Sequence, residues 1–113
     1  MIVKKNPLKL NPLQLRTLAL FQELARHPGS ASPVPQTDDI FVSQLPHPHG
    51  DHFHIGAKVA LTSDATGLQN PSVWVALERK GLIRSGFPYA LTLTKAGQDY
   101  DTSGAITLYG SDH

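Results

Sequence analysis

The sequence predicts a small α+β domain, and three observations support this fold class. Residues 13–26 carry leucines at helical spacing. Residues 53–61 alternate apolar and other side chains with a period of two, as a half-buried strand does. Residues 71–83 combine a second helical pattern with the start of a strand. With 113 residues, the chain has the length of one domain. We therefore predict a single domain over residues 1–113.

Composition narrows the class of protein. The chain has no Cys, which excludes disulfides, cysteine zinc sites and cysteine nucleophiles. It has no apolar run long enough to span a membrane, and its start lacks the apolar core of a signal peptide, so we expect a cytoplasmic protein with no membrane partner. The net charge is +1, but basic residues gather in 1–26 and 68–95 and acidic residues in 27–67 and 96–113. Basic segments that share one face would favour a phosphate-bearing partner.

The first helix is predicted to begin at Asn11-Pro12, because Asn caps free backbone N–H groups and Pro fits the first turn. It should extend to Arg26 and end at residues 27–29. Residues 28–37 contain three prolines and predict a flexible, extended loop. We expect the only two glutamates, Glu23 and Glu78, to be surface charges.

A hairpin is predicted next. Residues 40–45 form a short apolar run, which would pair with the alternating strand 53–61 around a tip at residues 46–51. A helix over residues 57–66 is the alternative, and the short periodicity does not separate the two.

A second helix follows Asn70-Pro71, which repeats the capping pattern, and runs from 71 to 80. Val73, Ala76 and Leu77 should face the core, together with Trp74 as a core anchor rather than a base-stacking residue. Gly81 is placed to end the helix in the left-handed conformation.

The rest of the chain predicts a hairpin, a short helix and a tail. A strand from residue 82 and a strand over 89–94 flank a turn at 85–88, where we expect Phe87 to be exposed. A helix over 95–100 follows a threonine cap. The tail over 101–113 is expected to be loose, or to add an edge strand at 106–109.

The segment from Gly67 to Ile83, GLQNPSVWVALERKGLI, resembles the recognition-helix segment of winged helix-turn-helix proteins such as the MarR-like and PadR-like regulators. In these families a helix of this pattern leads into the wing hairpin, and "L-T-x-x-G" often follows the second wing strand. Residues 91–97, LTLTKAG, are similar to that second motif. The resemblance implies a winged-helix-like domain, with the histidine-rich hairpin as an addition, and a regulator that binds DNA as a homodimer. Helix 11–26 or the tail 101–113 would be the dimer surface.

The DNA-binding candidates lie on the exposed side of this segment. Polar and basic side chains near a recognition helix contact base edges and phosphates. The candidates are Gln69, Ser72, Val75, Arg79, Lys80 and Arg84. Lys4, Lys5 and Lys9 would form a basic arm. No phosphate-binding glycine loop or serine-nucleophile motif is present, so we predict that the protein is not an enzyme. A winged helix used only for protein–protein contacts is an alternative.

A histidine cluster carries the other candidate chemistry. His47, His49, Asp51, His52 and His54 are residue types that bind zinc. Residues 47–52 resemble the H-x-H-x-D-H motif of metallo-β-lactamase-fold hydrolases, which implies two metals. That fold needs about twice this length and further ligands downstream, so the preferred interpretation is a polar hairpin tip without a cofactor. A zinc-binding module is the alternative.

Overall fold

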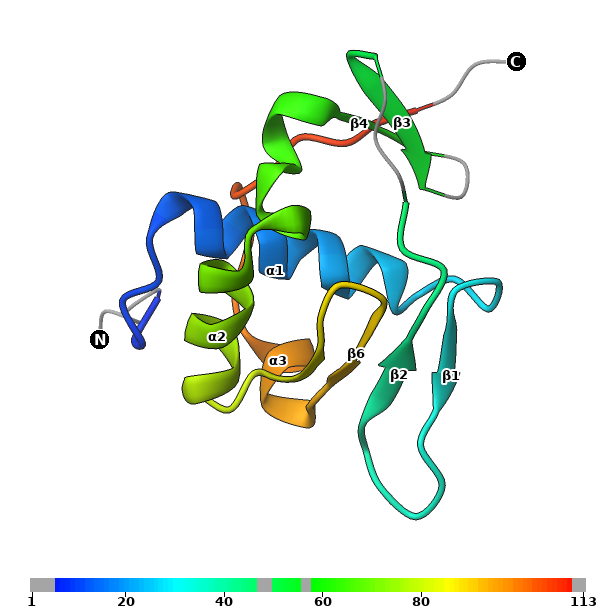
Figure 1. Ribbon diagram of the computed structural model, residues 1–113, viewed down its shortest axis with the longest axis vertical. Coiled ribbons are helices and arrows are strands. Elements are labelled where there is room, and N and C mark those ends of the chain that lie inside the picture. Colours follow the sequence, from blue (N-terminus) through cyan, green and yellow to red (C-terminus); the bar gives the residue numbers. More distant parts are fainter. Residues whose placement is uncertain (1–5, 47–49, 56–57, 111–113) are drawn as a thin grey trace.

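The computed structural model describes residues 6–46, 50–55 and 58–110 and confirms an α+β fold (Figure 1). The helices in this part of the chain are α1 (Pro12–Leu24), α2 (Pro71–Arg79) and α3 (Lys95–Asp99), with 3₁₀ turns η1 (Thr62–Asp64) and η2 (Thr66–Gln69). The strands are β1 (Ala31–Pro33), β2 (Ile40–Val42), β3 (His52–Ile55), β4 (Lys58–Leu61), β5 (Ile83–Gly86), β6 (Ala90–Leu93) and β7 (Tyr109–Gly110).

The strands form two antiparallel sheets. The first has the order β1-β2-β6-β5, and the second has the order β3-β4-β7. In the first sheet β6 pairs on one side with β5, its neighbour in the chain, and on the other with the distant β2, through Ile40↔Leu93 and Val42↔Leu91. The β5–β6 hairpin is thereby fixed to a strand that precedes α2 in the sequence.

Helix α1 lies at the centre of the molecule and crosses between the two sheets (Figure 1). Its residues from Thr17 to Leu24 are buried, and Leu18, Leu20, Phe21 and Leu24 share one hydrophobic core with residues of α2 and of both sheets. This half of the helix is therefore interior. In the second sheet, β7 lies at an edge.

The predicted helix caps are confirmed. The Asn11 side chain accepts a hydrogen bond from the Gln14 N–H, and the Gln14 side chain accepts one from the Asn11 N–H, which makes a capping box. The Asn70 side chain accepts a hydrogen bond from the Ser72 N–H, and the Thr94 hydroxyl accepts one from the Gly97 N–H. These side chains satisfy backbone donors that no helical carbonyl can reach.

The predicted hairpin between 40–45 and 53–61 is wrong. The run over 53–61 is two strands, β3 and β4, which pair with each other through Phe53↔Ala60 and Ile55↔Lys58. A period-two pattern alone does not show where one strand ends and the next begins. The helix proposed over 57–66 is also wrong, because strand β4 and the turn η1 take its place.

Two further expectations need correction, and one alternative is confirmed. The loop over 28–37 contains β1, which pairs with β2 through Ser32↔Phe41. Phe87 is half-buried rather than exposed, because its ring packs edge-on against Trp74, with ring centroids 5.1 Å apart. For the tail, the edge-strand alternative is confirmed at Tyr109, which pairs with Val59 in β4.

Glu23 is not a surface charge. It is only 3% exposed, and three cationic or titratable side chains surround its carboxylate. Arg26 Nη1 lies 2.7 Å from Oε1, while His27 Nε2 and Lys58 Nζ lie 3.1 and 3.6 Å from Oε2. Burial by itself raises the pKa of this carboxyl group. The hydrogen bond with His27 and the charges of Lys58 and Arg26 outweigh burial, so the pKa of Glu23 lies below its usual value.

Candidate nucleic-acid interface

Helix α2 is held in a fixed orientation by Trp74. The indole is fully buried, and its Nε1 donates to the backbone carbonyls of Gly67 and Leu68, both at 3.2 Å. Its ring also packs edge-on against Phe21 of α1, with centroids 5.1 Å apart. Trp74 is therefore a core anchor, as predicted, and it ties α2 to both η2 and α1.

The end of α2 turns directly into the β5–β6 hairpin. Gly81 has φ +76°, the left-handed conformation predicted for it, which glycine adopts without steric cost. The Thr94 N–H and hydroxyl both bond to the Leu82 carbonyl, which joins the start of this hairpin to its end. The helix and the hairpin therefore form one continuous unit on the surface.

The exposed face of α2 is centred on three of the predicted residues. At about 100° per residue, Ser72, Val75 and Arg79 fall within a sector of about 60° opposite the buried Val73, Trp74 and Leu77. All three are exposed. The Arg79 guanidinium makes no ion pair or hydrogen bond with any residue that the structure describes, so it is available to an anion.

Two charged residues flank this face, and each has a hydrogen bond to another segment of the protein. The Glu78 carboxylate accepts a hydrogen bond from the Ser85 N–H at 2.9 Å, which turns it toward β5. The Lys80 ammonium donates to the Leu8 carbonyl at 2.9 Å and so lies beside the N-terminal segment. Lys80 is predicted to contact phosphate, and it would have to exchange or share this surface hydrogen bond to do so.

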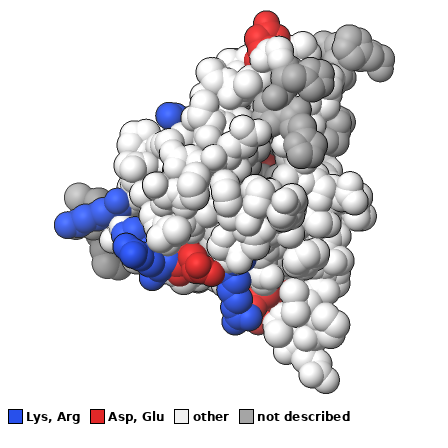
Figure 2. All heavy atoms as spheres, in the orientation of Figure 1, with Lys and Arg blue, Asp and Glu red and all other residues white. Residues whose placement is uncertain are grey.

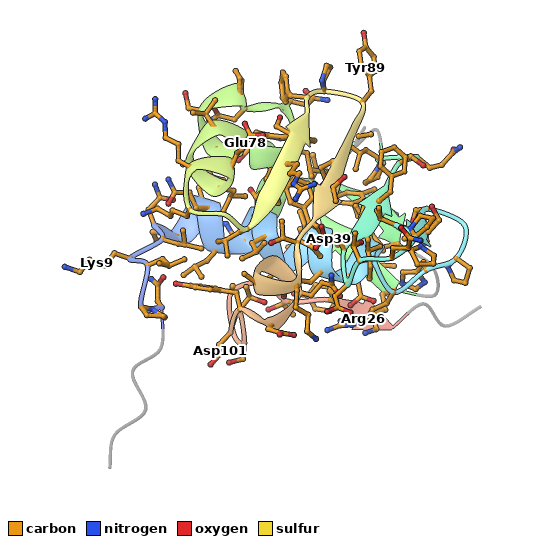
Figure 3. All side chains as sticks on the ribbon, turned by 90° about the horizontal axis from the view of Figure 1, so that it is seen from below. Lys9, Arg26, Asp39, Glu78, Tyr89 and Asp101 are labelled. Carbon is orange, nitrogen blue, oxygen red and sulfur yellow. The ribbon has the colours of Figure 1, made fainter. Side chains whose placement is uncertain are left out.

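The basic character of this region is moderate. Figure 2 shows Lys and Arg side chains along the lower left edge of the molecule, around the end of α2, with acidic side chains among them. Arg84 Nη2 lies 3.9 Å from Asp39 Oδ2, and the Arg84 side chain is 74% exposed. Lys9 is also exposed, and its side chain projects away from the protein in Figure 3. Lys4 and Lys5 of the predicted arm lie outside the described residues.

Sequence reasoning missed Tyr89, which is 81% exposed at the end of the β5–β6 hairpin and points away from the protein (Figure 3). A hollow of about 300 Å³ lies between Tyr89 and the exposed, predicted Gln69; its other lining residues are Leu45, Pro46, Leu68 and Pro88. The sequence predicted the turn at 85–88. It did not show which of the two aromatic side chains at this turn, Phe87 or Tyr89, packs inward.

The histidine cluster is only partly described. His47 and His49 lie outside the described residues. His52 and His54 are exposed on the face of β3 opposite Phe53 and Ile55, with ring centroids 5.7 Å apart. The predicted zinc set is incomplete here, because no group of three metal-binding side chains comes together within the described parts of the chain.

Asp51 lies beside His52 rather than with a set of ligands. Its Oδ1 is 2.9 Å from His52 Nδ1, and this hydrogen bond lowers the pKa of Asp51. The Asp51 side chain is 96% exposed, so the pair lies in solvent at the start of β3.

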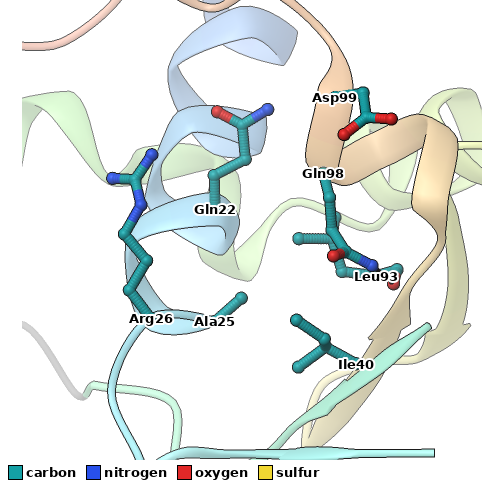
Figure 4. A pocket seen from close by; sticks show the side chains of 7 residues that line it. All are labelled: Gln22, Ala25, Arg26, Ile40, Leu93, Gln98 and Asp99. Carbon is teal, nitrogen blue, oxygen red and sulfur yellow. Dashed lines mark hydrogen bonds between the residues drawn. The ribbon is translucent and has the colours of Figure 1, made fainter. Parts of the chain in front are cut away.

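A cavity of about 260 Å³ lies between α1, β2 and α3 (Figure 4). It is lined by Gln22, Ala25, Arg26, Ile40, Leu93, Gln98 and Asp99. The side-chain amide nitrogens of Gln22 and Gln98 already donate to backbone carbonyls, and Arg26 is bonded to Glu23. No lining residue belongs to α2, so the cavity is separate from the candidate interface.

Comparison of the chain with protein-family models, curated proteins and solved structures finds no match. Within the part of the chain that the structure describes, no helix combines the length and the apolar character needed to cross a membrane.

Proposed function

We propose that this protein is a non-catalytic, winged-helix-like DNA-binding protein of the transcription-regulator type, with α2 as recognition helix and the β5–β6 hairpin as wing. The observation that carries the proposal is the exposed face of α2. Ser72 and Val75 would face base edges, and Arg79 would meet a phosphate, one turn further along the helix.

The order of elements supports this proposal. A helix that ends at a left-handed glycine and turns into a short hairpin is the arrangement that the resemblance of residues 67–97 implies. The pairing of β6 with β2 holds the hairpin against the core, so its position relative to α2 is set by the fold.

The arrangement departs from a helix-turn-helix at one point. Within the described residues, no α-helix separates α1 from α2, and the turns η1 and η2 stand in that place. Both hydrogen bonds of the Trp74 indole end in η2, and η2 also packs on α1. We propose that these turns support α2 in place of the first helix of the motif, which crosses the DNA backbone in helix-turn-helix proteins.

The charged residues around this face support a small number of phosphate contacts. Arg79, Lys80 and Arg84 lie on or beside the face, whereas Glu78 and Asp39 offset part of their charge. We therefore expect two or three phosphate contacts per chain and a correspondingly moderate salt dependence.

The proposal is tested by comparing Arg79→Ala with Lys58→Ala. Each variant removes one exposed positive charge, but Lys58 lies on β4 in the other sheet, next to Glu23. With a fluorescent random-sequence duplex, Arg79→Ala should weaken binding and make the negative slope of log K against log salt shallower by about 0.9, the contribution of one phosphate. Lys58→Ala should leave both quantities unchanged. Equal effects of the two substitutions would contradict the assignment of α2.

Two alternatives predict different results, one in the duplex-binding assay and one in thermal unfolding with and without zinc. A winged helix used only for protein contacts would not bind the duplex at any salt concentration. A histidine-based zinc module would instead be stabilised by zinc, and His52→Ala with His54→Ala would abolish that stabilisation. A homodimer, which the resemblance implies, would double the number of phosphate contacts per complex.

A further inference from the structure

Val75 is an apolar side chain at the centre of a face that is otherwise polar. It is 45% exposed, whereas the other large apolar residues of α2 are buried. Ser72 precedes it by one turn and Arg79 follows it by one turn. The face therefore presents a hydroxyl, two methyl groups and a guanidinium in line, over about 10 Å of helix.

No competing charge occupies the position beside Val75. Glu78, the acidic residue of α2, is turned toward β5 by the Ser85 N–H. The Lys80 ammonium is on the opposite flank, at the Leu8 carbonyl. The charged groups of Glu78 and Lys80 are thus bonded elsewhere on the protein, and Val75 is exposed between Ser72 and Arg79.

The chemistry of a duplex offers one complement to such a side chain. In the major groove, the base edges of A·T pairs expose the C5-methyl group of thymine, which is the apolar contact that proteins use there. The valine side chain has no hydrogen-bonding group, so it cannot bond to the donors and acceptors on the edges of the bases.

We infer that Val75 contacts a thymine methyl group in the major groove and biases the protein toward A·T-containing sites. This inference rests on the proposed DNA-binding function and names the residue and base group that would give it sequence preference. Removal of one methyl-sized apolar contact from water corresponds to a factor of about three to four in Kd.

The test uses two duplexes that differ only in that methyl group. One is an alternating A–T duplex of about 24 base pairs, and the other has uracil in place of every thymine. The two duplexes have the same backbone charge and the same hydrogen-bonding groups on their base edges. Fluorescence anisotropy would be measured at one low salt concentration for the wild type and for Val75→Ala, which retains a good helix former on an exposed position. Leu61→Ala, a truncation of another exposed apolar residue on β4, is the control.

The wild type and Leu61→Ala should bind the thymine duplex about three- to fourfold more tightly than the uracil duplex, and Val75→Ala should bind the two equally. Equal wild-type affinities for both duplexes would overturn the inference but leave DNA binding intact. A thymine preference that survives Val75→Ala would overturn the assignment to this residue. No binding to either duplex would refute the proposed function, and the inference with it.

Discussion

The substitution Glu23→Gln tests the buried charge cluster that fixes the end of α1 against the second sheet. The carboxylate is almost fully buried and contacts Arg26, His27 and Lys58. Glutamine keeps the shape but loses the charge that all three partners face. The substitution should therefore destabilise the fold through electrostatics and not through packing.

The magnitude follows from the contacts. A hydrogen bond to a charged group contributes about 1.5–3 kcal/mol. The Arg26 and Lys58 side chains are 67% and 49% exposed, so water screens their contribution, and both can be rehydrated after the substitution. We expect a net loss of about 2 kcal/mol in the free energy of unfolding at neutral pH, which lowers the melting temperature by several degrees in a domain of this size.

The pH dependence gives an independent signature. The pKa of Glu23 in the folded protein lies below its usual value of 4.5, so the ionised carboxylate stabilises the fold at pH values above 4.5. This contribution is lost as the pH falls through the lower folded-state pKa. Glutamine does not titrate, so the difference in stability between wild type and Glu23→Gln should shrink toward zero on acidification.

Urea unfolding of both proteins from pH 7 down to about pH 3 measures this difference. Glu78→Gln, at an exposed carboxylate with one backbone contact, is the control and should change the free energy of unfolding by less than about 1 kcal/mol. A difference between wild type and Glu23→Gln that is absent at pH 7, or is constant over the whole range, would refute this account of the cluster.

Two further predictions concern the packing that positions α2 and its hairpin. Gly97→Ala should lower the free energy of unfolding in urea by about 1–3 kcal/mol, because an added Cβ would clash with the Leu82 carbonyl oxygen. Gly29→Ala is the control, since an added Cβ there would meet open space, and it should change the free energy of unfolding by less than about 0.5 kcal/mol. Equal costs would show that α3 does not pack as described. Trp74→Ala should cost about 3–5 kcal/mol in the same measurement, and a small loss would mean that the indole is not the anchor of α2.

Local signals in the sequence predicted the helices well. Asn11 and Asn70 mark helix starts because their side chains satisfy free backbone donors, and Gly81 marks a helix end because its φ is positive. These effects involve neighbouring residues only. The exposed positions of Ser72 and Arg79 followed from the same helical periodicity.

The strand pairing could not be predicted in the same way. The partner of β2 is β6, about fifty residues further along the chain, and no local pattern specifies that pairing. Glu23 and Phe87 were misplaced for a related reason. Their burial depends on Lys58 and Trp74, which are distant in sequence or on another element. Tertiary contacts decide such positions, and a pattern within one segment does not contain them.

The proposed interface, the exposed face of α2, would bind DNA through a small number of phosphate contacts. The most direct test is fluorescence anisotropy of a labelled random-sequence duplex titrated with the wild-type protein at about 50 and 200 mM salt. Two or three contacts per chain predict that Kd rises about 10- to 40-fold over this fourfold change in salt, at a slope of about 0.9 per phosphate. No binding at 50 mM salt, or binding that does not change with salt, would contradict the account.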